Sequence, residues 1–224
     1  EMKRPDRFMK LEIEELADTK CLPCIDEVIL QKLMKDVIDY IIDVDKIRNI
    51  LEKRRTGIWY ADVKNFYEGM EQVANMKEFY KVHIEGFHLA NADEVWNEYT
   101  TEYYKMDTYY RLFHRSYAES LKIYSPELPD LFYQVMKQME GLYKNWFLEK
   151  LNDNWEHAAE EELLQSGRIC GIAQQTDFYQ SKIKNSDTRV FVIISDALRY
   201  EVAKTLAEEL QRETRSEVSV SSIQ

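Results

Sequence analysis

The chain has 224 residues, of which 45% are hydrophobic, 12% aromatic and 32% charged, so it has enough apolar material for a core and is not wholly disordered. Six Gly and four Pro are too few for the many turns of a β-sandwich or small barrel. With a formal net charge of −11, the chain lacks the overall excess of basic residues that proteins use to bind nucleic acid non-specifically. At about 150 residues per domain, the length predicts one or two domains.

Apolar residues recur every three or four positions as far as about residue 186, which predicts a mostly α-helical fold built as an antiparallel bundle. Asp26 is expected to cap a first helical stripe that continues to Leu51, and Gly57 ends that pattern. Further stripes run over residues 59–87, 96–117 and 132–146, with a Pro-containing break at residues 125–130 before the last. Residues 152–187 are more polar and are expected to hold a shorter helix at about 155–165 within a connecting region.

The stripe over residues 96–117 consists only of aromatic residues and Met. Its steps of three and four are regular, which favours a helix seam in a bundle core over a stacking platform for bases or a cofactor. The segment also carries about as many acidic as basic residues, whereas a base platform usually comes with a basic excess. Its members are Trp96, Tyr99, Tyr103, Met106, Tyr110, Phe113 and Tyr117.

Three weaker signals are better explained by structure than by chemistry. The pair Cys21 and Cys24 has C-x-x-C spacing, but the helix-like segment before it and the isolated position of Cys170 disfavour a redox or zinc site. The basic run at residues 53–55 suits a helix C-terminus. The scattered histidines, which lack the spacing of a metal motif, are expected on the surface or in a seam: His83, His88, His114 and His157.

The pattern changes at Arg189. Residues 190–194 (Val-Phe-Val-Ile-Ile) form an unbroken run typical of a buried parallel strand, residues 197–212 are expected to form a helix, and residues 217–221 alternate as a second strand. A turn is expected at Arg215 and Ser216. Together these segments predict a βαβ unit, here a truncated stub.

Asp196 follows the first predicted strand of this unit, where ligands of open α/β sheets bind. A carboxylate there can ligate a metal or act as a base. Asp196 or Ser195 can equally cap the following helix, and position alone does not separate these roles. No Gly-rich phosphate loop accompanies the strand, so a dinucleotide or P-loop site is not expected.

Residues 190–201, Val-Phe-Val-Ile-Ile-Ser-Asp-Ala-Leu-Arg-Tyr-Glu, resemble the opening strand and helix of the PglZ domain, which belongs to the alkaline phosphatase superfamily and to bacteriophage-exclusion (BREX) defence systems. Weaker similarities extend the resemblance to the helical region that precedes the domain in type A members. They are Arg54-Arg55 with Trp59-Tyr60, residues 103–107, residues 128–132, residues 145–148 and residues 152–155. The resemblance implies a helical domain with a connecting segment at 1–187 and the incomplete start of an α/β domain at 188–224.

The resemblance implies a hydrolase of phosphate or sulfate esters with a pair of divalent metals, usually zinc. Asp196 matches the position of a metal ligand, and Arg199 and Glu201 belong to the signature as phosphate or structural contacts. Arg199 could contact phosphate, or it could pair with Glu201 or Glu208 on the helix face. The nucleophile and the other ligands of the family are expected beyond Gln224, so we expect this chain to be inactive alone and to hold no metal, or to hold it weakly. It would then be a fragment cut inside a larger enzyme.

Two other functions remain open. The helical part, which holds nearly all the net negative charge, could be an interaction module that docks other phage-defence proteins. The parent protein could also be a metal-dependent nuclease or phosphodiesterase that reaches phage or host DNA through the full complex. The sequence shows no membrane span and no signal peptide, so a cytoplasmic location is expected.

Overall fold

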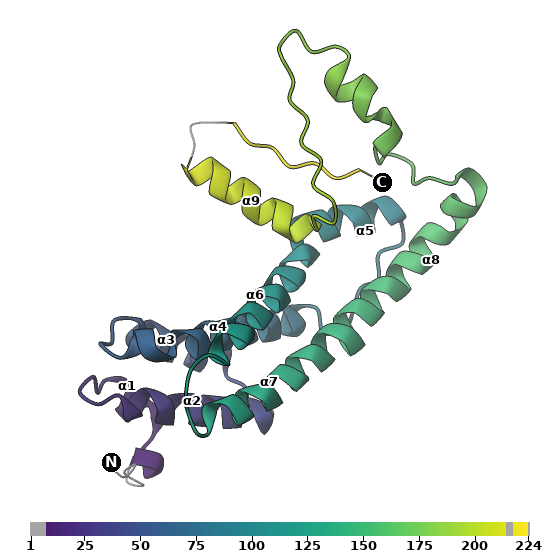
Figure 1. The fold of residues 1–224 in the computed structure, drawn as a ribbon. Helices are drawn as coiled ribbons and strands as arrows, with labels where there is room; N and C mark the ends of the chain where they lie inside the picture. Colours follow the sequence, from purple (N-terminus) through teal and green to yellow (C-terminus); the bar gives the residue numbers. More distant parts are fainter. Residues whose placement is uncertain (1–7, 214–216, 224) are drawn as a thin grey trace. The chain divides into compact units, whose positions relative to one another are not determined.

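The structure is a computed structural model that describes residues 8–213 and 217–223 (Figure 1). Helices make up most of this described part and confirm the helical fold. Contacts divide the chain into two units, one formed by residues as far as Glu85 together with Tyr109–Leu148, the other by Gly86–Thr108 together with residues from Glu149 onward. This division differs from the sequence-based boundary at residues 187 and 188, which stays a prediction.

The first unit is built around the long helix α4 (Tyr60–Val82), which packs against α2 (Cys24–Ile38), α3 (Val44–Arg55) and α7 (Leu128–Leu142). Helix α1 (Ile13–Ala17) packs on α2 and α3. The later residues of α6 (Tyr104–Ser120) also belong to this unit. At its core, the ring of Phe132 contacts the rings of Phe66 and Phe113 at centroid distances of 5.3 and 5.4 Å, so the periodic apolar positions form the predicted seam.

The first predicted stripe, over residues 26–51, is two helices and not one. The chain leaves α2 at Ile38, Tyr40 adopts a left-handed backbone with φ of 60°, and the side chain of Ile41 is 67% exposed. The Asp43 carboxylate accepts a hydrogen bond from the Lys46 backbone N–H at 2.9 Å and caps α3. The apolar residues keep their spacing of three and four positions across this break, so the sequence pattern does not reveal where α2 ends.

Asp26 does not cap a helix, because α2 begins at Cys24 and Asp26 is fully buried inside it. Its carboxylate accepts two hydrogen bonds from the Arg54 guanidinium and one from the Tyr67 hydroxyl. The basic run does lie at the end of α3, as expected, but Arg54 is fully buried while its two neighbours are exposed to solvent. A buried guanidinium needs such partners, because an unpaired buried charge is costly.

The second unit contains α5 (Ala92–Glu98), the first residues of α6, α8 (Glu149–Ser166) and α9 (Tyr200–Glu213). A π-helical turn, Tyr99–Tyr103, joins α5 to α6, so the aromatic stripe is not one uninterrupted α-helix. The Asn154 amide of α8 bonds both backbone groups of Leu89, donating to its carbonyl at 2.8 Å and accepting from its N–H at 3.2 Å. Helix α8 is longer than the predicted helix at 155–165.

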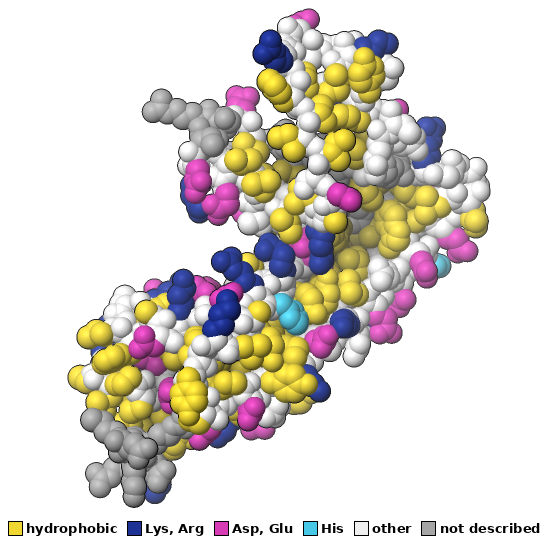
Figure 2. Space-filling model, in the orientation of Figure 1, with side chains coloured by type: hydrophobic (Ala, Val, Ile, Leu, Met, Phe, Trp, Pro, Cys, Tyr) yellow, Lys and Arg dark blue, Asp and Glu magenta, His cyan; other side chains and the backbone are white. Residues whose placement is uncertain are grey.

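The predicted strands are absent from the described part of the chain. Residues 190–194 and 217–221 form no strand ladder, and the side chains of Phe191, Ile193 and Ile194 are 81–91% exposed. Figure 2 shows hydrophobic side chains on the surface of the part that follows α8. A strand is defined by its ladder partners, and the described residues offer these segments none. The turn expected at Arg215 and Ser216 lies outside the described residues. The helix predicted between the two strand segments is present as α9 (Tyr200–Glu213).

No helix in the described ranges is long and apolar enough to span a membrane.

Candidate functional site

Asp196 lies with Ala197 in an exposed turn before α9. The helix begins at Tyr200, three residues later than predicted, and the Arg199 carbonyl accepts its first hydrogen bonds, from Val202 N–H at 3.1 Å and Ala203 N–H at 3.0 Å. Asp196 is therefore not the helix cap. Its Oδ1 instead accepts a hydrogen bond from the Ala197 N–H at 2.9 Å, and Ala197 adopts a left-handed backbone with φ of 56°.

Arg199, the second signature residue, faces two buried carboxylates. Its Nη2 lies 3.4 Å from Asp107 Oδ1 at the start of α6, and its Nε lies 3.2 Å from Glu201 Oε1. The side chains of Asp107 and Glu201 are 4% and 0% exposed, whereas that of Arg199 is 56% exposed. The Tyr99 hydroxyl donates to the other Asp107 oxygen, Oδ2, at 2.9 Å. The signature residues Arg199 and Glu201 thus contact each other, and Asp107 completes a charged cluster.

Tyr200, the next residue of the signature, contacts the π-helical turn Tyr99–Tyr103. Its hydroxyl donates to the Thr100 carbonyl at 3.0 Å, and its ring lies 5.9 Å from that of Tyr99 and 5.7 Å from that of Tyr104. Burial raises the pKa of both Tyr104 and Tyr200 above the usual value of 10.0. The Lys204 ammonium lies 5.4 Å from the centre of the Tyr104 ring and 5.9 Å from that of Tyr200. The start of α9 is therefore anchored at successive residues.

Tyr200 is anchored to the π-helical turn Tyr99–Tyr103 through the Thr100 carbonyl. A π turn replaces the regular i to i−4 pattern, and such turns recur at functional sites. Here the Thr100 carbonyl accepts from Tyr200, and Tyr99 reaches Asp107, eight residues further along the chain. The sequence analysis placed Tyr99 in the aromatic stripe and gave no role to Thr100 or Asp107. The signal available was an acidic residue, Asp107, between members of the aromatic stripe.

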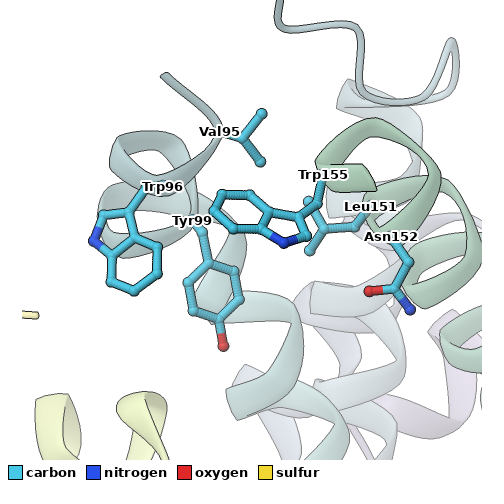
Figure 3. Close-up of a pocket in the computed structure, with 6 residues that line it drawn as sticks. All are labelled: Val95, Trp96, Tyr99, Leu151, Asn152 and Trp155. Atoms are coloured by element: carbon cyan, nitrogen blue, oxygen red, sulfur yellow. The ribbon is translucent and has the colours of Figure 1, made fainter. Parts of the chain in front are cut away.

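The aromatic stripe divides between core and pocket. Tyr103, Met106 and Phe113 are buried, which confirms the core interpretation for these residues. Trp96 and Tyr99 instead line a small pocket of about 190 Å³ between α5 and α8 (Figure 3). The other lining residues are Val95, Leu151, Asn152 and Trp155. The Trp96 indole N–H donates to the Ser222 hydroxyl at 2.7 Å.

The described residues do not by themselves form a metal site. Among them, no three His, Cys, Asp or Glu side chains come together as ligands. Asp196 is an exposed hard oxygen donor of the kind that suits a divalent cation, but a stable site needs several such donors. Cys21, Cys24 and Cys170 form no disulfide within the described part of the chain. Among the described residues, Asp196 suits the role of one metal ligand, but it has no further ligands around it to complete a site.

Comparisons with known proteins agree with the signature. Residues 178–224 match the family model described as the BREX system PglZ alkaline phosphatase-like domain. The chain is 29% identical over 224 residues to the alkaline phosphatase-like protein BrxZ of Escherichia coli O9:H4 (strain HS), covering 95% of this chain and 25% of that protein. It is 28% identical over 229 residues to the alkaline phosphatase-like protein PglZ of Bacillus cereus (strain H3081.97), covering 100% of this chain and 26% of the relative. No solved structure matches.

The chain thus spans about a quarter of the length of these curated relatives. The family model includes Asp196, Arg199 and Glu201, and the two relatives extend the likeness to the helices before them. The resemblance to the PglZ family that the sequence motifs indicated is therefore confirmed, by the family model over residues 178–224 and by BrxZ and PglZ over nearly the whole chain.

Proposed function

We propose that this chain is part of a BREX-system protein with an alkaline phosphatase-like domain, and that Asp196 contributes one ligand to a pair of divalent metals, zinc by the family resemblance. The observation that carries the proposal is the position of Asp196, an exposed carboxylate inside the matched region at the turn before α9. When bound, such metals polarise phosphoryl oxygens and activate a nucleophile.

The remaining ligands and the nucleophile would be supplied from outside the described residues. One carboxylate cannot hold two metals, so this chain alone should hydrolyse no phosphate ester and bind metal weakly or not at all. The segments 190–194 and 217–221 would become strands once neighbouring strands complete the sheet, because their β-branched and aromatic residues suit a buried parallel strand.

The test is to extend the chain through the complete PglZ-like domain and compare the wild type with Asp196→Asn. We expect bound metal, measured by inductively coupled plasma mass spectrometry, to fall in the variant, with loss of phosphate ester turnover. Glu217→Gln, which changes another exposed carboxylate of the same region, is the matched control. Unchanged metal content in Asp196→Asn would contradict the proposal, as would turnover by the 224-residue chain that Asp196→Asn abolishes.

The substrate class separates the phosphatase from the nuclease alternative. Both attack phosphorus, so the same metal site serves either reaction. Parallel assays of the extended protein with p-nitrophenyl phosphate, bis-p-nitrophenyl phosphate and single-stranded DNA distinguish a phosphomonoesterase from a phosphodiesterase or nuclease.

A second proposed function is the docking of other defence-system proteins by the helical part. All but one of the eleven net negative charges lie before residue 188, and α8 alone carries six acidic residues against one lysine. Helix α8 also exposes Leu163 and Leu164 beside Glu160. A basic partner protein suits this surface better than DNA. Reversing Glu156 and Glu160 to Lys should abolish salt-sensitive capture of the other proteins of the system, and unchanged capture would contradict the docking role.

A further inference from the structure

The turn that carries Asp196 holds a strained residue. Ala197 has φ of 56°, a left-handed backbone that costs free energy in any residue with a Cβ. Such residues persist where the surrounding structure fixes them, and they gather at functional sites. Within the turn, the restraint is the hydrogen bond from the Ala197 N–H to Asp196 Oδ1, which is exposed to solvent and so contributes little.

A second restraint begins two residues later, at Arg199. Its guanidinium faces Asp107 and Glu201, and the adjoining Tyr200 is bonded to the Thr100 carbonyl and packed on two tyrosine rings. Only Ala197 and Leu198 separate Asp196 from this anchored position. A chain fixed at Arg199 and Tyr200 therefore leaves few conformations to the turn.

Asp107 contributes to this anchor through its contact with Arg199. It is almost fully buried, and its two oxygens have different partners, Tyr99 on Oδ2 and Arg199 on Oδ1. The Tyr99 hydroxyl thus orients the carboxylate that receives Arg199. Because Arg199 already faces two buried carboxylates, its charge is compensated within the chain, which favours a structural over a phosphate-binding role.

We infer that Asp107, oriented by Tyr99, is a positioning residue that acts through Arg199 to hold the Asp196–Ala197 turn in its left-handed conformation. The importance of this turn rests on the proposed function, in which Asp196 is a metal ligand. Asp107 itself touches no reacting atom.

The test is nuclear magnetic resonance of the 224-residue chain, because the Ala197 Cα and Cβ chemical shifts report a left-handed backbone. In Asp107→Asn we expect these signals to move toward values of an averaged backbone, with about tenfold faster hydrogen exchange in residues 197–204. Asp107→Glu, which keeps the charge, should restore part of the signature. Glu102→Gln, which alters a more exposed carboxylate paired with Lys105, is the control and should change neither.

A purely structural role of Asp107 would alter melting temperature and leave the Ala197 signature unchanged in the folded protein. That result, or a wild-type Ala197 without left-handed signals, would overturn the inference. If Asp107→Asn does not fold, Tyr99→Phe and Arg199→Lys give the same test with smaller expected shifts.

Asp196→Asn separates this inference from the proposed function. The asparagine amide oxygen can still accept the Ala197 N–H, so the left-handed signature should survive, while the metal ligand is lost. Retained metal in the extended protein would overturn the metal proposal alone, and a retained signature in Asp107→Asn would overturn the positioning role alone.

Discussion

Arg54 and Asp26 form a fully buried bidentate ion pair, with Arg54 Nε donating to Asp26 Oδ1 at 2.8 Å and Nη2 to Oδ2 at 2.7 Å. The same guanidinium donates to the Ala17 and Thr19 carbonyls, and the Tyr67 hydroxyl donates to Asp26 Oδ1 at 2.7 Å. These contacts join α2, α3, α4, the end of α1 and the loop after it in the first unit. The pair is therefore a structural centre, and its disruption should affect the whole unit.

Asp26→Ala should lower the free energy of unfolding by about 3–5 kcal/mol, because it leaves the Arg54 guanidinium buried without its partner. Urea denaturation followed by circular dichroism measures the change. Arg55→Ala, which removes the exposed neighbour paired with Glu71, should cost less than about 1 kcal/mol. Equal losses in both variants would contradict a special role for the buried pair.

The Tyr67 hydroxyl makes the stability of the first unit sensitive to high pH. Burial, together with the nearby Asp26 carboxylate, raises the pKa of Tyr67 well above its usual value of 10.0. The folded protein therefore keeps this proton after the unfolded chain has released it, so stability falls as the pH rises above about 10. Denaturation at a series of pH values should show a shallower fall in Tyr67→Phe than in the wild type, and identical slopes would refute the assignment.

Gly69 is required by the close approach of Phe132. A Cβ at Gly69 would lie 2.3 Å from Phe132 Cζ, and that ring cannot retreat easily because it is packed against Phe66 and Phe113. Gly69→Ala should therefore destabilise by about 1–3 kcal/mol or more, although Ala favours helix.

Gly141 in α7 provides the matched control for Gly69. The nearest atom to an added Cβ there is 4.0 Å away, so Gly141→Ala should stabilise by about 0.5–1 kcal/mol through helix propensity alone. Thermal denaturation of both variants measures these changes. A stabilising Gly69→Ala would show that Phe132 of α7 does not pack closely against Gly69 of α4.

Ala197→Gly should stabilise the second unit by up to about 1 kcal/mol, because Gly adopts a left-handed backbone without strain. The matched substitution Ala203→Gly, within α9, should destabilise by about 1 kcal/mol. Chemical denaturation reports both values. A destabilising Ala197→Gly would indicate that the residue is not left-handed in solution.

Periodicity located most helices because their apolar faces pack in the core, and α4, α7 and α9 lie close to their predicted positions. It missed the break after Ile38, since the apolar residues around Tyr40 keep a helical spacing that no Gly or Pro interrupts. It also predicted strands that the described residues do not form, because the composition of residues 190–194 reflects a preference for a sheet whose other strands are not among them.

For the candidate site, the motif identified Asp196, Arg199 and Glu201, which lie near one another along the chain. Asp107 could not be found in this way, because it meets Arg199 across 92 positions of sequence. Local patterns carry information about local structure, whereas such a pairing arises only when α6 and the residue before α9 come together in the fold. The same applies to Asp26 and Arg54, whose positions in the sequence indicate only a helix cap and a helix end.

The exposed segment 190–194 has a consequence for anyone who handles this chain in isolation. Five consecutive β-branched or aromatic residues without charge or proline are the type of sequence that stacks with copies of itself. Concentrated samples should therefore form intermolecular sheets, and dilution or a lysine at Ile193 should prevent them. A neighbouring strand that covers these residues would therefore protect the chain from association as well as complete its sheet.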